Sequence, residues 1–198
     1  MRLTTLPPAV VAVMLSACET EPVLLNSERI EQRFGSYGIT VLPSEPGLRR
    51  SSLFSIHEDE AICRTCAVVR FADQPHDRYS EEHAKVLAGN SIGAIFRSHG
   101  WDVHKQTMYI GSLLLPNRKT QIGELMHITD QGELAMHVYQ LLLVRNEQVF
   151  EYATIVETHH PEYLSESDVL ELYEYDESTA LTPQVVSDLV YLILGDEK

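Results

Sequence analysis

The segment from residue 125 to residue 158 constrains the fold of this chain more than any other. It contains three runs rich in apolar and β-branched residues, with short polar turns between them. The middle run, 134–144, is apolar on nearly both faces, which is typical of a strand that is covered on both sides. Because turns of this length join antiparallel neighbours, the sequence predicts 134–144 as a central strand with 125–129 and 149–158 as further strands.

The first part of the chain predicts one helix and three more strands. The helix is expected to begin at Asn26 or Ser27, which can cap it, and to end at Gly35. A β-rich run then stops at Pro43, and two longer runs follow it. We expect the three strands at 39–42, 48–57 and 62–71, the last two forming a hairpin.

Three helices are expected in the rest of the chain. The clearest is capped by Ser80, carries an apolar stripe with i, i+3, i+4 spacing and ends at Gly100. A strand at 101–110 should follow it. Caps at Ser165 and Thr182 predict the starts of the two remaining helices.

The predicted order is helix, three strands, helix, four or five strands, two helices. Strands and helices do not alternate, so a parallel α/β sheet is not expected. We predict an α+β fold: a largely antiparallel sheet of about six to eight strands, packed against a central helix and C-terminal helices. The length suits a single folded domain, placed at 27–198.

The first residues have the composition of an export signal. Arg2 is the basic start, an apolar run covers 9–15, and small residues precede Cys18. The apolar run is too short to span a bilayer, which takes about 20 residues. The tetrapeptide Leu15-Ser16-Ala17-Cys18 resembles the lipobox of bacterial lipoprotein precursors, in which a signal peptidase cuts before the cysteine and the cysteine carries the lipid.

This resemblance implies a signal peptide at 1–17 and a lipidated cysteine with a short tether at 18–26. Acyl chains on Cys18 would make the membrane a partner of the protein. In such lipoproteins an aspartate after the cysteine commonly signals inner-membrane retention, and this chain has Glu19 there. The resemblance therefore implies the outer membrane, facing the periplasm, if the cell is Gram-negative.

The charge of the chain disfavours nucleic acid as a partner. The whole chain has 15 Lys and Arg against 29 Asp and Glu, and removal of the leader takes away only Arg2 among them, which leaves a formal charge of −15. Such a surface repels phosphate backbones and anionic headgroups. We interpret the acidity mainly as a device for solubility.

Cys63 and Cys66 have the spacing of redox disulfides. The residues after them are strand-like, however, and residues three apart in a regular strand point to opposite faces and lie about 10 Å apart. We therefore expect no disulfide, with Cys63 as a core thiol on the same face as Val69 and Phe71. The pair could bridge if the strand is irregular.

Three of the nine histidines are the candidates for a metal site. If the turns of the 125–158 segment are tight, His127 and His137 become diagonal neighbours on one face. The next strand would bring His160 toward the same end of that face. Three imidazoles could bind zinc or another transition metal and leave a position open for water. Structural or surface histidines are the alternative, and a register error of one residue would destroy the cluster.

No motif in the folded domain fixes a reaction. The chain lacks a Gly-x-Ser-x-Gly nucleophile elbow and a phosphate-binding glycine loop. We therefore expect a non-enzymatic, lipid-anchored lipoprotein of the cell envelope that binds a protein or a small ligand near the membrane, without a cofactor. The alternative is a metal-dependent envelope hydrolase that uses His127, His137 and His160.

Overall fold

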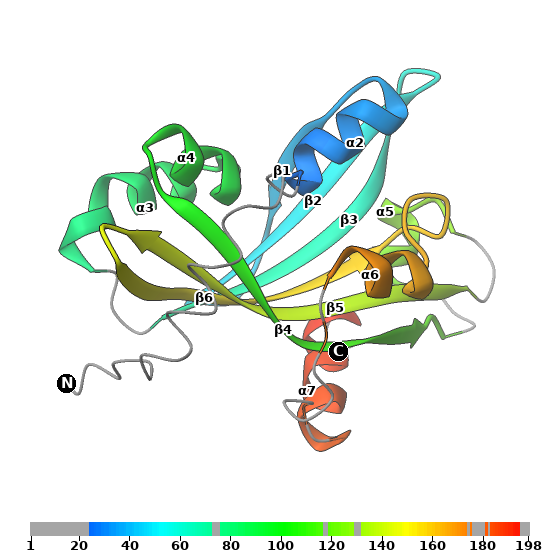
Figure 1. Ribbon diagram of the computed structural model, residues 1–198. Coiled ribbons are helices and arrows are strands. Elements are labelled where there is room, and N and C mark those ends of the chain that lie inside the picture. The colour runs from blue at the N-terminus through cyan, green and yellow to red at the C-terminus, as the bar shows by residue number, and fades with distance from the viewer. Residues whose placement is uncertain are drawn as a thin grey trace.

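Six strands form one antiparallel sheet in the computed structural model, which describes residues 24–72, 76–116, 119–128, 132–173, 175, 181 and 183–194 (Figure 1). Their order across the sheet is β1-β2-β3-β6-β5-β4. The strands are β1 (Gly38–Leu42), β2 (Leu48–His57), β3 (Glu60–Phe71), β4 (Asp102–Leu114), β5 (Glu133–Arg145) and β6 (Gln148–His159). The predicted α+β fold is confirmed, and β2–β3 and β5–β6 form antiparallel pairs where the sequence predicted neighbouring strands.

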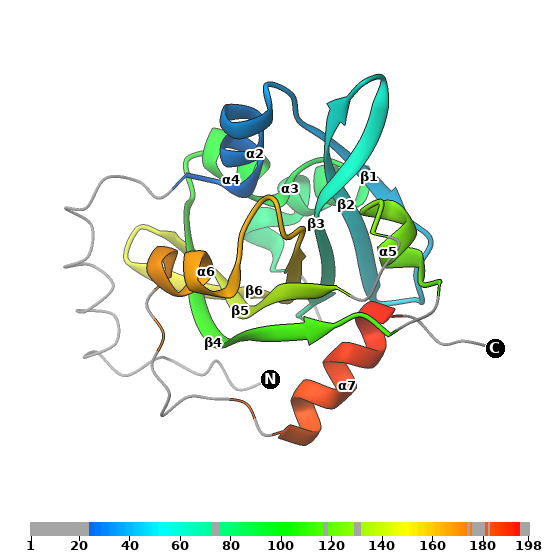
Figure 2. The ribbon, with the colours of Figure 1, turned by 90° about the vertical axis from the view of Figure 1, so that its right-hand side faces the viewer.

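Helices cover both faces of this sheet. On one side lie α2 (Asn26–Phe34), α3 (Ser80–Leu87), α4 (Ile92–Ser98) and α6 (Glu166–Leu172), with the short 3-10 helix η2 (Asp77–Tyr79) before α3. On the other side lie α5 (Gln121–Leu125) and α7 (Pro183–Leu194). Figure 2 shows α2 and α7 on opposite sides of the strands. Within the described residues, no helix is both long enough and apolar enough to cross a membrane.

Several helix ends lie where the sequence placed them. Gly35 adopts the left-handed conformation, with φ of 75°, and ends α2. Ser165 accepts a hydrogen bond from the backbone N–H of Asp168, and the Asp168 carboxylate accepts one from the N–H of Ser165, so a reciprocal capping box begins α6. The last helix begins at Pro183, and its expected cap, Thr182, lies outside the described residues.

The single helix expected from Ser80 to Gly100 is wrong, because two helices occupy this segment. α3 ends at Leu87 and α4 begins at Ile92. Between them Gly89 has a φ of 106°, a conformation that interrupts helical hydrogen bonding and that glycine adopts without strain. The buried side chains are Glu82 and Val86 in α3 and Phe96 in α4, whereas Leu87 is 58% exposed, so the expected stripe is not one continuous buried face.

The strand expected at 125–129 is also wrong. Residues Gln121–Leu125 form α5, where the Thr120 hydroxyl accepts a hydrogen bond from the N–H of Gly123 as a helix cap. Ile122 and Met126, four residues apart, are fully buried. This spacing and the Thr120 cap are helical signals that the expected strand did not take into account.

Three β-bulges twist the sheet and change which side chains of a strand point to each of its two faces. They place Arg64, Met108 and Tyr152 as extra residues in β3, β4 and β6. A bulge adds local twist and reverses the alternation beyond it. In Figure 1, β2 and β3 run steeply, whereas β4 descends from α4 and then bends to run nearly level beside β5.

We call the two sides of the sheet the polar face and the apolar face. The polar face lies under α2, α3, α4 and α6 and carries buried ionisable side chains among its apolar ones: Arg49, His137, Glu157 and His159. The apolar face lies over α5 and α7, and the buried core on it consists of Cys, Val, Leu, Ile and Met side chains.

Candidate functional site

A cavity of about 90 Å³ lies between the polar face and the residues that begin α2 and α4. Its floor consists of buried apolar strand residues, among them Leu53, Val69, Leu141 and Ile155. Its rim is half-buried and includes Leu25, Ile39 and Ile92. Because an apolar cavity of about 150 Å³ holds a benzene molecule, this cavity admits a ligand of only a few heavy atoms.

Arg49 lines the cavity and has no counter-ion among the described residues. Only 5% of the residue is exposed. Its Nε donates to the Ser51 hydroxyl at 3.1 Å and its Nη2 to the Asn90 carbonyl at 2.9 Å, both neutral acceptors. Nη1 is buried and has no hydrogen-bond partner in the described part of the chain. Burial lowers the pKa of Arg49, although a guanidinium stays protonated at neutral pH.

A buried ion pair forms another part of the cavity wall. Lys105 Nζ lies 3.0 Å from Glu157 Oε2, and the two side chains are 19% and 7% exposed. Burial disfavours the charged form of each group. The attraction between them outweighs burial, so the pKa of Lys105 is raised well above its usual value and that of Glu157 is lowered. Glu157 is therefore already neutralised, whereas Arg49 is not.

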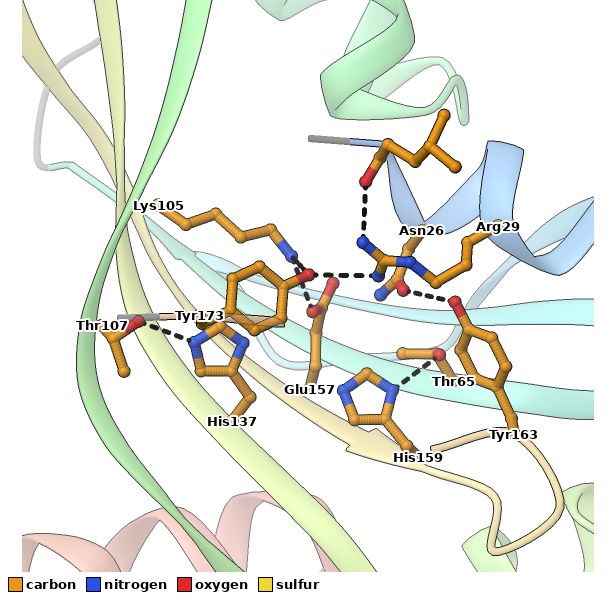
Figure 3. Close-up of polar contacts among 11 residues, drawn as sticks. Asn26, Arg29, Thr65, Lys105, Thr107, His137, Glu157, His159, Tyr163 and Tyr173 are labelled. Atoms are coloured by element: carbon orange, nitrogen blue, oxygen red, sulfur yellow. Dashed lines mark hydrogen bonds and ion pairs between the residues drawn. The ribbon is translucent and has the colours of Figure 1, made fainter. Parts of the chain in front are cut away.

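Tyr173, which follows α6, contacts the Lys105–Glu157 ion pair. The Tyr173 hydroxyl accepts hydrogen bonds from Lys105 Nζ at 3.4 Å and from Arg29 Nη1 at 3.3 Å. The Tyr173 ring stacks on His137, with centroids 4.4 Å apart (Figure 3). The segment that follows α6 thus ties α2 to the polar face of the sheet.

Two fully buried histidines flank Glu157. His137 lies opposite Glu157 in the β5–β6 pairing, and His159 lies two residues further along β6. His137 Nε2 is 3.2 Å from the Thr107 hydroxyl, and His159 Nδ1 is 3.0 Å from the Thr65 hydroxyl. The other nitrogen of each ring has no partner within the described residues and lies on the side of Glu157 (Figure 3).

These histidines are held in their neutral form. Burial, with the nearby Lys105 ammonium as a smaller cause, lowers the pKa of His137 to about 2. Burial also lowers the pKa of His159 to about 4, although the Glu157 carboxylate acts in the opposite direction. Each ring is therefore a neutral hydrogen-bonding group at physiological pH.

Asn26 is the last polar member of the site. The sequence suggested it as a helix cap, but it is the first residue of α2, after Leu25 at the cap position. Its Oδ1 accepts a hydrogen bond of 2.7 Å from the Tyr163 hydroxyl. Asn26 lines the cavity, and its Nδ2 is buried without a partner among the described residues.

The three histidines predicted as metal ligands are not brought together. His127 follows α5 and lies near Glu60, with Nδ1 3.5 Å from Oε2, because the segment before it is a helix instead of a strand. His160 Nε2 contacts the Met126 carbonyl at 3.1 Å, and His137 lies in the site described above. No group of three His, Cys, Asp or Glu side chains in the described residues is arranged to hold a metal ion. The metal-dependent hydrolase thus remains a prediction without a site among these residues.

Cys63 does not share a face with Val69 and Phe71, which corrects the expectation from strand alternation. The bulge at Arg64 reverses the alternation, so Cys63 and Cys66 both lie in the core of the apolar face. Both are free thiols. Burial raises their pKa values to about 12 and about 11, so little reactive thiolate forms at neutral pH.

Sequence reasoning missed Arg49, Lys105 and Glu157. A weak signal was present, since each is a charged residue inside a segment predicted or observed as a strand. Whether such a residue faces solvent or the interior depends on the bulges and on the helices above it. His137 was singled out, but for a metal cluster that the structure does not form.

Comparisons with known proteins do not identify a related site of known function. No protein-family model matches the chain, and no curated protein matches it significantly. Among solved structures, it is similar to a transcriptional regulator of the GntR family from Enterococcus faecalis V583. The TM-score is 0.31 at 10% identity, over 71% of this chain and 96% of that one. A likeness this weak supports no statement about function.

Proposed function

We propose that this chain is a lipid-anchored protein of the cell envelope whose domain binds a small organic anion without catalysing a reaction. The lipobox-like Leu15-Ser16-Ala17-Cys18 supports the anchor, and it lies outside the described residues. The cavity at Arg49 supports the ligand. These are independent observations, so each half of the proposal has its own test.

The observation that carries the ligand class is the buried, uncompensated charge of Arg49. Burying a cation costs free energy unless an anion or several hydrogen bonds replace its water. Arg49 has neutral partners for two of its nitrogens and none for Nη1 among the described residues. A carboxylate in the cavity would complete this set with a charge-assisted hydrogen bond.

The remainder of the cavity fits the apolar part of such a molecule. Its walls are mainly aliphatic, with Leu53, Val69, Leu141 and Ile155 at the floor. A few well-placed polar groups in an otherwise apolar concavity are typical of small-molecule sites. The volume limits a ligand that leaves the rim unchanged to a short-chain acid.

Calorimetric titration of the purified full-length chain at pH 7 tests the ligand class. We expect isobutyrate to bind and isobutyramide, its neutral counterpart of the same size, not to bind. Replacing the guanidinium by an apolar chain in Arg49→Met should weaken isobutyrate binding about 10- to 100-fold, the range for a hydrogen bond to a charged group. Equal binding of acid and amide, or binding of neither, would overturn the proposal.

A matched control stands next to Arg49 in the sequence. Arg50 points to the other side of β2, where it donates to the Gln121 side chain and the Ile193 carbonyl. Arg50→Met therefore removes the same charge from the protein without touching the cavity. It should leave the affinity for isobutyrate unchanged, which separates a local contact from a change in net charge.

The anchor has a separate test. When the precursor is expressed in a Gram-negative host fed an alkyne-labelled fatty acid, the membrane-bound protein should carry the label. Cys18→Ser should lose the label and leave the membrane fraction. Labelling that persists in this variant would exclude Cys18 as the anchor without affecting the ligand proposal.

A further inference from the structure

Asn26 lines the cavity and has a buried amide nitrogen, Nδ2, with no hydrogen-bond partner among the described residues. We infer that the cavity takes a small carboxylate with a second oxygen acceptor, a hydroxy acid or an oxo acid, and that Asn26 Nδ2 donates to this second oxygen. This inference rests on the proposed function, because it assumes that Arg49 binds the carboxylate. It adds a residue that selects among carboxylates.

The orientation of the Asn26 amide is fixed from outside the cavity. The Tyr163 hydroxyl donates to Asn26 Oδ1 at 2.7 Å, and Tyr163 is only 1% exposed. The ring of Tyr163 is held between Phe34 and His159, with centroids 6.0 Å and 5.8 Å away. With its oxygen engaged in this way, the amide presents Nδ2 as a donor that finds no acceptor among the described residues.

Folding of α2 does not account for this asparagine. Leu25 occupies the cap position and supplies no side-chain hydrogen bond, and the Asn26 side chain bonds Tyr163 instead of capping the helix. A buried amide donor without an acceptor destabilises the protein. Asn26 Oδ1 has a structural role as the acceptor for Tyr163, whereas Nδ2 forms no hydrogen bond within the described residues. A group that enters the cavity would explain the Nδ2 donor.

The two donors demand acceptors of different kinds. Arg49 is a cation without a counter-ion among the described residues, so it selects a negative charge, whereas the Asn26 amide is neutral and selects any oxygen acceptor. The other charged groups of the wall, Lys105 and Glu157, form an ion pair, so a ligand does not have to balance their charges. The complementary ligand thus carries one negative charge and one neutral oxygen.

Paired acids that differ only in this oxygen test the inference. Lactate and isobutyrate differ by a hydroxyl in place of a methyl group, as do glycolate and propionate. In calorimetric titrations of the full-length protein we expect the hydroxy acid of each pair to bind about tenfold more tightly, the factor expected for one additional hydrogen bond. Asn26→Leu should abolish this preference, measured as the ratio of the two affinities within each variant.

Tyr163→Phe provides a second variant that keeps the packing of the ring. It removes the hydroxyl that orients the amide, so the preference for lactate should fall while isobutyrate binding stays constant. Tyr79→Phe is the matched control, because Tyr79 is also buried on this side of the sheet but does not bond Asn26. If Asn26→Leu does not fold, Tyr163→Phe decides the question.

The outcomes separate this inference from the proposed function. Isobutyrate binding that depends on Arg49, with no preference for lactate, would overturn the role of Asn26 and leave the anion site standing. If Asn26→Leu keeps the wild-type ratio of lactate to isobutyrate affinity, Asn26 does not bind the second oxygen and the inference is wrong. If neither acid binds the wild-type protein, the proposed function fails first.

Discussion

The two faces of the sheet are built from the same strands, yet they differ in what they bury. On the apolar face, α5 and α7 cover a core of aliphatic and sulfur-containing side chains. On the polar face, α2, α3, α4 and α6 cover Arg49, Glu157, His137 and His159 as well as an aromatic core. Buried polar groups reduce stability unless they are fully satisfied, and their concentration on the polar face is the reason that the proposed ligand site is placed there.

The largest expected effect of a single substitution concerns the ion pair on the polar face. Lys105→Met leaves the Glu157 carboxylate buried without its cation, and breaking such a pair typically costs about 3–5 kcal/mol of unfolding free energy. Urea unfolding at pH 7 measures this loss. The double variant Lys105→Met with Glu157→Gln removes both charges and should recover most of it. A loss below about 1 kcal/mol for the single variant would show that Glu157 does not need Lys105.

A smaller effect is expected from the pH dependence of the two buried histidines. In the unfolded chain both titrate near pH 6.5, whereas in the folded protein the pKa values are about 2 for His137 and about 4 for His159. As the pH falls below 6.5, the two histidines bind protons in the unfolded state but stay neutral in the folded state, so the unfolding free energy decreases. Between pH 7 and pH 5 this amounts to about 2 kcal/mol for each histidine.

Substitution identifies the source of this pH dependence. His159→Asn removes one titrating group, so the difference in unfolding free energy between pH 7 and pH 5 should shrink by about 2 kcal/mol. Titration of Glu157 contributes little to the change in unfolding free energy between pH 7 and pH 5. Its lowered pKa gives a stabilisation that is complete above the unfolded value near 4.5 and is lost only at lower pH. An unchanged difference in the variant would contradict a neutral, buried His159.

The smallest effect is expected on the apolar face. Met136 is fully buried there, and Met136→Leu nearly conserves its volume, so the unfolding free energy should change by less than about 1.5 kcal/mol. The affinity for isobutyrate should not change at all, because the side chain points away from the cavity. Altered binding in this variant would mean that the two faces are coupled and would weaken the comparison between them.

The parts of the fold that could be predicted are those that depend on neighbouring residues. Gly35 and the Ser165–Asp168 box ended and began helices as predicted, since caps satisfy backbone groups within one turn. The β2–β3 and β5–β6 pairs followed from apolar runs separated by short turns. An error arose at α5, where the β-rich runs that follow suggested a strand and the helical cap at Thr120 was overlooked.

The candidate site could not be predicted in the same way. Its members Asn26, Arg49, Lys105 and Glu157 are far apart in the chain and belong to four different elements. Strand alternation assigns a face only while the strand stays regular, and the bulge at Arg64 already moved Cys63 to the face that alternation had excluded. The histidine cluster failed for the related reason that 121–125 is helical.

The sequence by itself determined the class of fold, most element boundaries, the acidic charge and the lipobox-like start, because each depends on composition or on contacts between residues close in the chain. The tertiary structure decided which side chains are buried together. Bulges, the break between α3 and α4, and the packing of α2 over the sheet brought to one cavity an arginine and an amide that each have a nitrogen without a partner in the described part of the chain. These arrangements depend on long-range packing, which minimises unfilled volume and unsatisfied polar groups over the whole domain and which no local pattern records.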